Sequence, residues 1–267
     1  MVPTCLLFVP GDRHDRFEKA LAGGAGAVIF DLEDAVAPER KALAREHVVE
    51  HLAHAAGGGT RRLVRINGLR SRAGLEDLLA VAAARPDGIV VPKVESSGEV
   101  EIIAGALPGA DVVAMVESVA GMERVEEIAR ASGLTALAFG CADLSAELGA
   151  SLTWEPLAAY RARLVLAARA AGVAAIDAPF LSGDVRDGAA AGEEAARAVA
   201  AGFDGKLAIH PAQVEPIRTA FTPSPAELER ARRIVAAAGN GGVAVVDGRM
   251  IDAPVVASAR RVIARAG

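Results

Sequence analysis

Short apolar runs rich in valine and isoleucine recur eight times along this chain, and a longer segment with helical periodicity follows each of them. Runs that are apolar on both faces belong in a parallel sheet that helices cover. We predict eight strands at Cys5–Pro10, Ala27–Glu33, Arg62–Asn67, Gly88–Val94, Asp111–Glu117, Leu134–Gly140, Ala174–Phe180 and Gly205–Pro211. We predict eight helices at Asp15–Ala22, Glu39–Ala56, Ala73–Ala84, Gly98–Leu107, Met122–Ala131, Pro156–Ala171, Gly192–Ala201 and Gln213–Phe221. Eight such repeats predict an α/β fold of the (β/α)8 TIM-barrel type, with a doubly wound open sheet as the alternative.

The chain continues beyond the eighth repeat with a segment that a barrel does not need. Pro225–Ala238 predicts a helix, GGVAVVDGRMIDAP predicts a hairpin that turns at Asp247 and Gly248, and Val255–Ala266 predicts a last helix. We therefore expect a catalytic barrel domain over residues 1–222 and a C-terminal helix-hairpin-helix appendage over residues 223–267. The appendage must pack on something, and a neighbouring subunit is as good a candidate as its own barrel.

Charge and cysteine content narrow the class of partner. The 29 basic and 34 acidic residues are mixed along the sequence and give a net charge of −5, so no basic stripe indicates a nucleic acid or an anionic membrane. Cys5 and Cys141 have no partners at metal-ligand spacing, which fits a reducing compartment. No apolar stretch approaches the roughly 20 residues that span a bilayer. We expect a cytoplasmic protein with a small-molecule substrate.

Polar residues interrupt the apolar runs at the carboxyl ends of the predicted strands, where the active site of a TIM barrel lies. Glu117 ends the fifth strand and Asp143 follows the sixth. Two neighbouring carboxylates repel each other unless they share a proton or a cation lies between them. Mg²⁺ takes hard oxygen ligands and is commonly held by one or two carboxylates. The pattern favours a Mg²⁺ site on Glu117 and Asp143; the alternative is that Asp143 caps a helix and Glu117 begins one.

Three further charged residues stand at the same end of the predicted barrel. Arg65 lies inside the end of the third strand, so we expect it to be partly buried and to need an anion, and its planar fork matches a carboxylate. The alternative is a structural ion pair with Asp31 or Glu33. Glu33 shares a strand phase with Asp31 and is predicted to point inward as a supporting group. Lys93 has the same ambiguity between substrate binding and a structural role.

These residues lie in blocks that resemble a known family. The blocks are LFVPGDRHDRFEKA, IFDLEDAVAPERKALAR, VRIN, VPKVES, VESVAG, GCADL, IHPAQV and GRMIDAPVV. They resemble, in order and over almost the whole chain, the citrate lyase beta-subunit-like proteins of the malyl-CoA and citramalyl-CoA lyase group, within the metal-dependent aldolase superfamily. The family usually has an acid where this chain has Ala142, so we expect either a weaker metal site or a different substrate.

The resemblance implies roles for particular residues. It implies Mg²⁺ on Glu117 and Asp143, and Arg65 on the carboxylate of a 2-oxo acid. It also implies that Asp252, in the appendage, reaches a neighbouring subunit's active site; the alternative is a turn residue before Pro254. The coenzyme A phosphates need positive charge, for which the candidates after the first strand are Arg13, Arg16 and Lys19. Their alternative is an ordinary solvated helix turn.

We therefore expect reversible carbon–carbon cleavage of a 3-hydroxyacyl thioester, such as malyl-, citramalyl- or citryl-CoA, into a 2-oxo acid and acetyl-CoA. Arg65, Arg16 and Lys93 are the predicted substrate contacts. The predicted catalytic residues are Asp252, as the acid, together with Arg65 and Glu33. Two alternatives stay open: a malyl-CoA-type thioesterase, and a non-catalytic paralogue that only binds a metabolite. A closed homo-oligomer, a homotrimer or a multiple of it, follows if Asp252 serves a neighbour.

Overall fold

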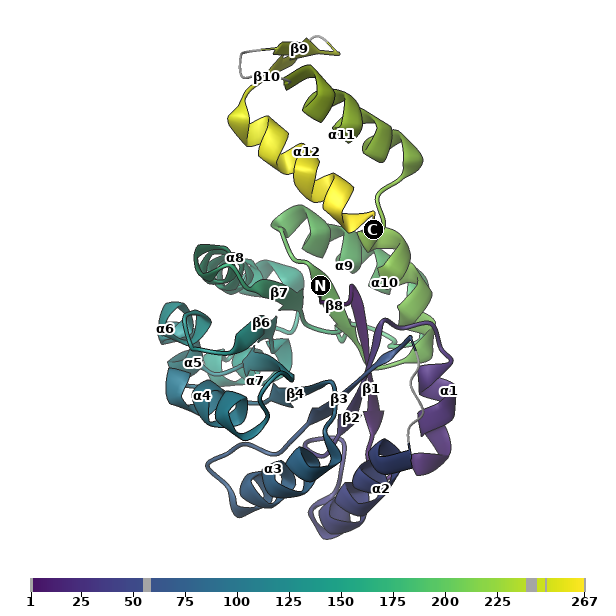
Figure 1. The fold of residues 1–267 in the computed structure, drawn as a ribbon, viewed down its shortest axis with the longest axis vertical. Coiled ribbons are helices and arrows are strands. Elements are labelled where there is room, and N and C mark those ends of the chain that lie inside the picture. The colour runs from purple at the N-terminus through teal and green to yellow at the C-terminus, as the bar shows by residue number, and fades with distance from the viewer. Residues whose placement is uncertain (1, 55–58, 239–243, 248, 267) are drawn as a thin grey trace. The chain divides into compact units, whose positions relative to one another are not determined.

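Eight strands form a closed parallel barrel in chain order, and β8 pairs back with β1 (Figure 1). The computed structural model describes residues 2–54, 59–238, 244–247 and 249–266. The strands are β1 (Cys5–Pro10), β2 (Ala27–Asp31), β3 (Arg61–Arg65), β4 (Gly88–Val91), β5 (Asp111–Val116), β6 (Leu134–Phe139), β7 (Ala174–Asp177) and β8 (Gly205–Ala208). The closed barrel confirms the predicted fold class and excludes the open sheet.

Helices surround the barrel in Figure 1. They are α1 (Phe17–Leu21), α2 (Lys41–His54), α3 (Arg72–Ala84), α4 (Ser97–Ala106), α5 (Val119–Glu123), α6 (Val125–Ala129), α7 (Cys141–Leu148), α8 (Trp154–Ala171), α9 (Gly188–Ala201) and α10 (Val214–Phe221), with 3-10 turns η1 (His14–Arg16), η2 (Pro38–Arg40) and η3 (Pro211–Gln213). The predicted helix Met122–Ala131 is wrong in one respect, because Arg124 leaves the helical region and separates α5 from α6. The helix α7 was not predicted at all.

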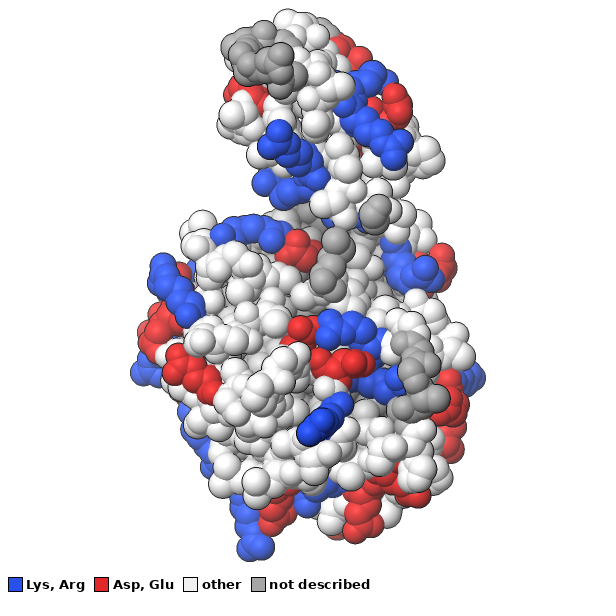
Figure 2. All heavy atoms as spheres, in the orientation of Figure 1, with Lys and Arg blue, Asp and Glu red and all other residues white. Residues whose placement is uncertain are grey.

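The inside of the barrel is filled with aliphatic side chains of mixed size. This cluster consists of Leu6, Ala27, Ile29, Leu63, Val90, Val113, Met115, Ala136, Ala138, Ile176 and Leu207. The interior of an eight-stranded barrel is just wide enough for such side chains to fill it. The interior is therefore a packed core, and chemistry is confined to the ends of the strands. Lys and Arg are interspersed with Asp and Glu on the face that Figure 2 shows.

The chain divides into two compact units, Met1–Ile217 and Arg218–Gly267, whereas the sequence placed the boundary after residue 222. The second unit contains α11 (Pro225–Ala238), the antiparallel strands β9 (Ala244–Val246) and β10 (Arg249–Ile251), and α12 (Ala253–Arg265). Its own small core includes Ile234, Ile251 and Ala259. Of the predicted hairpin turn, Asp247 is seen in a turn, and Gly248 lies outside the described residues. Among the helices described, none is long and apolar enough to cross a membrane.

Candidate active site

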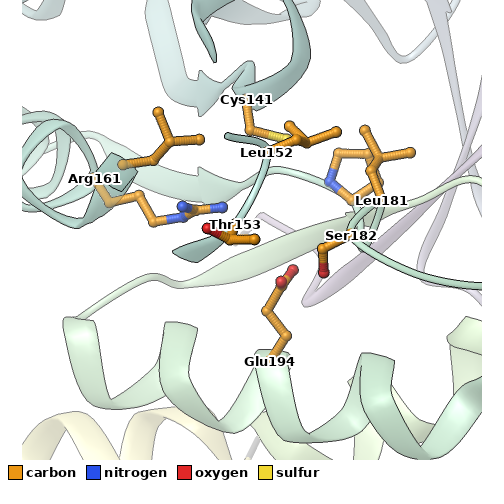
Figure 3. A pocket seen from close by; sticks show the side chains of 9 residues that line it. Cys141, Leu152, Thr153, Arg161, Leu181, Ser182 and Glu194 are labelled. Carbon is orange, nitrogen blue, oxygen red and sulfur yellow. The ribbon is translucent and has the colours of Figure 1, made fainter. Parts of the chain in front are cut away.

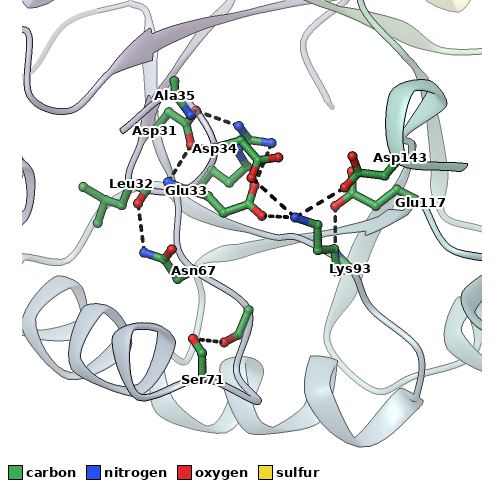
Figure 4. A network of polar contacts seen from close by, with 12 residues as sticks. Asp31, Leu32, Glu33, Asp34, Ala35, Asn67, Ser71, Lys93, Glu117 and Asp143 are labelled. Atoms are coloured by element: carbon green, nitrogen blue, oxygen red, sulfur yellow. Dashed lines mark hydrogen bonds and ion pairs between the residues drawn. The ribbon is translucent and has the colours of Figure 1, made fainter. Parts of the chain in front are cut away.

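Five charged side chains meet where β2 to β6 end (Figure 4). They are Glu33, Arg65, Lys93, Glu117 and Asp143. Arg65 is the last residue of β3. Glu33, Lys93 and Glu117 follow the ends of β2, β4 and β5 by one or two residues. Asp143 lies in the first turn of α7. The structure thus brings together five of the predicted site residues from five successive barrel units.

Lys93 links both predicted metal ligands. Its backbone N–H donates to Glu117 Oε1 at 2.8 Å, and its Nζ lies 3.3 Å from Asp143 Oδ2. Nζ also donates to Glu33 Oε1 at 2.7 Å and lies 3.4 Å from Asp34 Oδ1. Burial alone would lower the pKa of Lys93, but the hydrogen bond and charge of Glu33 raise it above its ordinary value. The ammonium is therefore a fixed positive charge among acidic side chains.

The backbone of Lys93 adopts a left-handed conformation, with φ of +53°. A residue other than glycine rarely adopts this conformation. It turns the Lys93 N–H toward Glu117 directly after β4 ends. The local backbone thereby serves the site as well as the side chain does.

Arg65 makes the ion pair that the sequence offered as an alternative. Its Nε and Nη2 donate to the two carboxylate oxygens of Asp31, at 2.7 and 2.6 Å. Its Nη1 lies 3.1 Å from Glu33 Oε2, and its guanidinium lies 4.7 Å from the ring centroid of Phe8. Burial would lower the pKa of Arg65, and Asp31 raises it above its ordinary value. The paired hydrogen bonds predicted for a ligand are thus made to Asp31, and Nη1 is the part directed toward the other site residues.

The carboxyl group of Glu117 is buried and closely packed. It is 5% exposed, and burial, with the charges of Glu33 and Asp143, raises its pKa to about 8 against the opposing effects of Arg65 and the Lys93 amide. Gly140 packs directly against it, because a Cβ at Gly140 would lie 2.2 Å from Glu117 Cβ. Burial also raises the pKa of Glu33. A cation beside these groups would favour their ionised forms.

Neither predicted metal ligand acts as a helix cap. The N-cap of α5 is Ser118, whose side chain accepts from the Gly121 N–H at 3.0 Å. The N-cap of α7 is Gly140, and Asp143 lies three residues further on. The capping interpretation of these acids is therefore wrong.

The donor set suits a hard cation held by few protein ligands. Among the residues that the structure describes, no three His, Cys, Asp or Glu side chains form a ready-made metal cage. Glu117 and Asp143 offer two carboxylates, and no described histidine or cysteine joins them in a three-residue group. Mg²⁺ is typically bound in this way, with water and substrate oxygens completing its coordination. The residues present therefore fit Mg²⁺ and do not fit a structural zinc site.

A groove of about 470 Å³ opens beside β1, α1 and the turn after β8. Arg16, Lys19 and His210 line it, and so does Phe8, whose ring lies under Arg65. The groove thus adjoins the cluster of charged residues through Phe8. Arg13 is not among its lining residues and instead pairs with Asp15 at 2.9 Å.

Asp252 belongs to the second unit, where it is exposed and forms the N-cap of α12. Its carboxylate accepts from the Val255 N–H at 3.1 Å, and Pro254 stands in the first turn. The sequence offered a turn before Pro254 as the alternative role of Asp252, and in the structure Asp252 begins a helix there.

Sequence reasoning missed two features near the site. Gly140 was seen as part of a motif but not as a packing surface for Glu117. The buried pair of Asp177 and Lys206 was not singled out either, although a charge inside each of the apolar runs AAIDAPF and GKLAIH was a visible signal. Arg161, which joins this pair, lines a small pocket with Cys141 (Figure 3).

Comparison with known proteins gives a consistent result. The model of the family described as HpcH/HpaI aldolase/citrate lyase matches residues 4–211. A (3S)-malyl-CoA thioesterase of Cereibacter sphaeroides is 39% identical, over 98% of this chain and 93% of that protein. An L-malyl-CoA/beta-methylmalyl-CoA lyase of the same species is 35% identical, over 98% and 94%. The solved structure of CitE from Mycobacterium tuberculosis in complex with magnesium, acetoacetate and coenzyme A has a TM-score of 0.85 and 36% identity, over 99% and 98%.

Proposed function

Because this chain belongs to the HpcH/HpaI aldolase/citrate lyase family, we propose that it is a Mg²⁺-dependent carbon–carbon lyase. Its substrate is a 3-hydroxyacyl thioester of coenzyme A, such as malyl-, citramalyl- or citryl-CoA, which it cleaves reversibly into a 2-oxo acid and acetyl-CoA. One observation carries the proposal: Glu117 and Asp143 come from neighbouring barrel units and both contact Lys93, beside Arg65. The CitE structure with magnesium, acetoacetate and coenzyme A supports the choice of ligands.

Glu117 and Asp143 would hold the metal ion. Glu117 is buried with a raised pKa, so its ionised form needs more positive charge than Arg65 and the Lys93 amide provide. When bound, Mg²⁺ supplies a Lewis acid for the hydroxyl and keto oxygens of the substrate. Lys93 holds the Glu117 carboxylate in place through its backbone N–H.

The remaining cations orient the substrate. Arg65 is locked by Asp31, so its Nη1 meets the acid end of the substrate in a fixed direction. Arg16 and Lys19, in the groove beside Phe8, are the contacts for the coenzyme A phosphates. Arg13 stays the weaker candidate because Asp15 occupies its guanidinium.

Two proton transfers complete the cleavage. The 3-hydroxyl loses a proton as the carbon–carbon bond breaks, the electron pair of that bond forms the thioester enolate, and the enolate carbon then takes up a proton. Glu33 is the acceptor, because its carboxyl is buried beside the Nη1 of Arg65 and burial raises its pKa. Asp252 of a neighbouring subunit is the donor, in a homotrimer or a multiple of it, with the appendage packing on that neighbour.

Thioester hydrolysis is the second candidate. It is favoured by the 39% identity to the (3S)-malyl-CoA thioesterase. Water would attack the thioester carbonyl, the carbon–sulfur bond would break with coenzyme A leaving as the free thiol, and the hydroxy acid would be released with its carbon skeleton intact. The same residues would bind the substrate, so the products distinguish the two reactions.

The test is an assay with Mg²⁺ and each of malyl-, citramalyl- and citryl-CoA, in which 2-oxo acid, acetyl-CoA and free CoA are measured separately. Asp143→Asn is the site variant, and Asp187→Asn, at the N-cap of α9, is the matched control. Equal amounts of 2-oxo acid and acetyl-CoA, lost only in Asp143→Asn, support the lyase. Free CoA with intact hydroxy acid replaces it by the thioesterase. Binding of a 2-oxo acid without any turnover replaces both by a metabolite-binding protein.

A further inference from the structure

Outside the candidate site, three charged side chains are buried between β7 and β8 and the helices α8 and α9, and a fourth, Glu194, is partly buried beside them. Asp177 and Lys206 pair in register on β7 and β8. Lys206 Nζ donates to Asp177 Oδ2 at 2.6 Å and to Glu194 Oε1 at 2.8 Å. From α8, Arg161 Nε donates to Asp177 Oδ1 at 2.8 Å. Two cations thus meet two anions in a place from which water is largely excluded.

Stability alone does not explain why these charges are buried. Arg161 is 3% exposed, and Asp177 and Lys206 are fully buried. Such clusters lose so much hydration that apolar replacements of similar volume are often neutral or stabilising. A buried ionic cluster is better explained when it fixes a particular geometry, and the surroundings of Arg161 show which geometry that is.

The guanidinium of Arg161 lies over two aromatic rings. Its central carbon is 4.8 Å from the ring centroid of Phe139 and 4.3 Å from that of Trp154. Phe139 is the last residue of β6 and is fully buried. Cys141, the first residue of α7, lines the same small pocket as Arg161 (Figure 3). Arg161 therefore supports the chain on both sides of Gly140.

The supported turn carries the candidate metal site. Gly140 donates its N–H to the Val116 carbonyl at 3.1 Å and packs against Glu117. Asp143 lies one helical turn further along α7. Because the hydrogen bond to Asp177 fixes the orientation of Arg161, the two rings in contact with its guanidinium are held in place as well. A shift of Phe139 would move Gly140, and with it the surfaces that place Glu117 and Asp143.

We propose that Arg161, held by Asp177, is a positioning residue that keeps Glu117 and Asp143 in the arrangement that binds a divalent cation; this inference rests on the proposed function. Arg161 touches neither substrate nor metal in this scheme. It acts through Phe139 and the turn from β6 to α7. Loss of its support is expected to weaken cation affinity by about tenfold to a hundredfold, the usual effect of changes outside the ligands themselves.

The experiment measures Mn²⁺ binding by electron paramagnetic resonance, without substrate, together with thermal unfolding. Arg161→Met removes the charge and the planar fork, and Arg161→Met/Asp177→Asn also removes the anion left behind. Arg163→Met is the control, because Arg163 lies on the same helix and makes a two-point ion pair with Glu126 at the surface. Trp154→Leu removes one stacking partner while leaving the Asp177 pair, in case Arg161→Met does not fold.

We expect weak Mn²⁺ binding in both Arg161 variants, an unfolding midpoint that recovers in the double variant, and an affinity that does not recover with it. Trp154→Leu should weaken binding less, and Arg163→Met should stay within about twofold of wild type. Wild-type affinity in Trp154→Leu and in the folded Arg161 variants, or recovery of affinity with stability in the double variant, overturns the positioning role. Absence of Mn²⁺ binding by the wild type, or unchanged binding by Asp143→Asn, overturns the proposed function instead.

Discussion

An alanine at position 140 tests directly whether Glu117 holds the cation. The new Cβ would lie 2.2 Å from Glu117 Cβ, 2.5 Å from its Oε2 and 3.1 Å from its Cδ. Ordinary contacts begin at 3.4 Å, so Glu117 must retreat by about 1 Å or turn its carboxylate away. The backbone itself accepts alanine, because φ of Gly140 is −100°. The perturbation therefore acts on the neighbouring acid and not on the conformation of the turn.

The expected effect on binding is large and the effect on folding moderate. Mg²⁺ demands near-ideal octahedral geometry, so a carboxylate displaced by about 1 Å ceases to be a ligand. We expect the Kd for Mn²⁺ to rise by about a hundredfold, the upper end for changes around a metal site. Overpacking should cost about 1–3 kcal/mol of unfolding free energy, which lowers Tm by several degrees. Titration followed by electron paramagnetic resonance gives the Kd, and circular dichroism gives Tm.

Gly105→Ala is the matched control, because nothing lies within 4 Å of the added Cβ and the residue is inside α4. This variant should bind Mn²⁺ as the wild type does and unfold at the same or a higher temperature. If folded Gly140→Ala binds Mn²⁺ within about twofold of wild type, then Glu117 is not a ligand or Gly140 does not hold it. Both explanations would refute the reasoning that connects Gly140 to the metal.

Three further predictions follow from the geometry. Asp252→Asn keeps the N-cap of α12 but removes the acid, so turnover should fall by about a hundredfold or more with Tm unchanged; full activity in a coupled assay would exclude Asp252 as the proton donor. Lys93→Gly keeps the N–H that holds Glu117, in a conformation that suits glycine, and removes an ammonium 3.3 Å from Asp143. Mn²⁺ should therefore bind about tenfold more tightly, and weaker binding in a titration would contradict this. Burial lowers the pKa of His51, so the unfolded chain takes up its proton first and stability is lost as pH falls below about 6.5. In His51→Phe, the free energy of unfolding from denaturant titrations should therefore depend less on pH in that range, and an unchanged pH slope would rule His51 out.

The barrel could be predicted because its strands are apolar on both faces. The starts of the strands were found well, since a polar loop changes there to a buried run. Seven of the eight predicted ends ran too far, because residues such as Leu32, Ile66 and Val94 stay fully buried beyond the last residues of β2, β3 and β4. The hydrophobic pattern of a sequence indicates which residues are buried, and at the end of a barrel the chain stays buried for a few residues after the strand has ended.

The helix α7 escaped prediction because its start lacks the usual signals. Its N-cap, Gly140, has no side chain to accept a hydrogen bond, and the eight residues that follow begin with Cys and Ala. Only the C-terminal end of α7 carries a clear signal, which is Gly149 in a left-handed conformation. Asp143 was therefore expected after a strand, with a helix cap as the alternative, and not inside a helix.

The sequence named Asp31 and Glu33 as possible partners of Arg65, but it did not decide between this ion pair and a ligand, and it did not indicate the partners of Lys93. Spacing showed that both stand at strand ends, but their acids come from other barrel units. Which acid pairs with which base depends on side-chain direction and reach across the barrel mouth. Lys93 adds a left-handed backbone whose N–H binds Glu117, and no residue pattern in the sequence indicates that conformation.

Closure of the barrel limits the strands through which this protein could pair with other copies of itself. All eight barrel strands have a neighbour on each side, so none presents free N–H and C=O groups as a template. Among the described residues, unpaired strand edges occur only in the β9–β10 hairpin, where the cross-strand pair Val245 and Met250 is 70% and 64% exposed. Precipitation at high concentration would therefore begin there, and a lysine at either position is the change that would suppress it without touching the barrel.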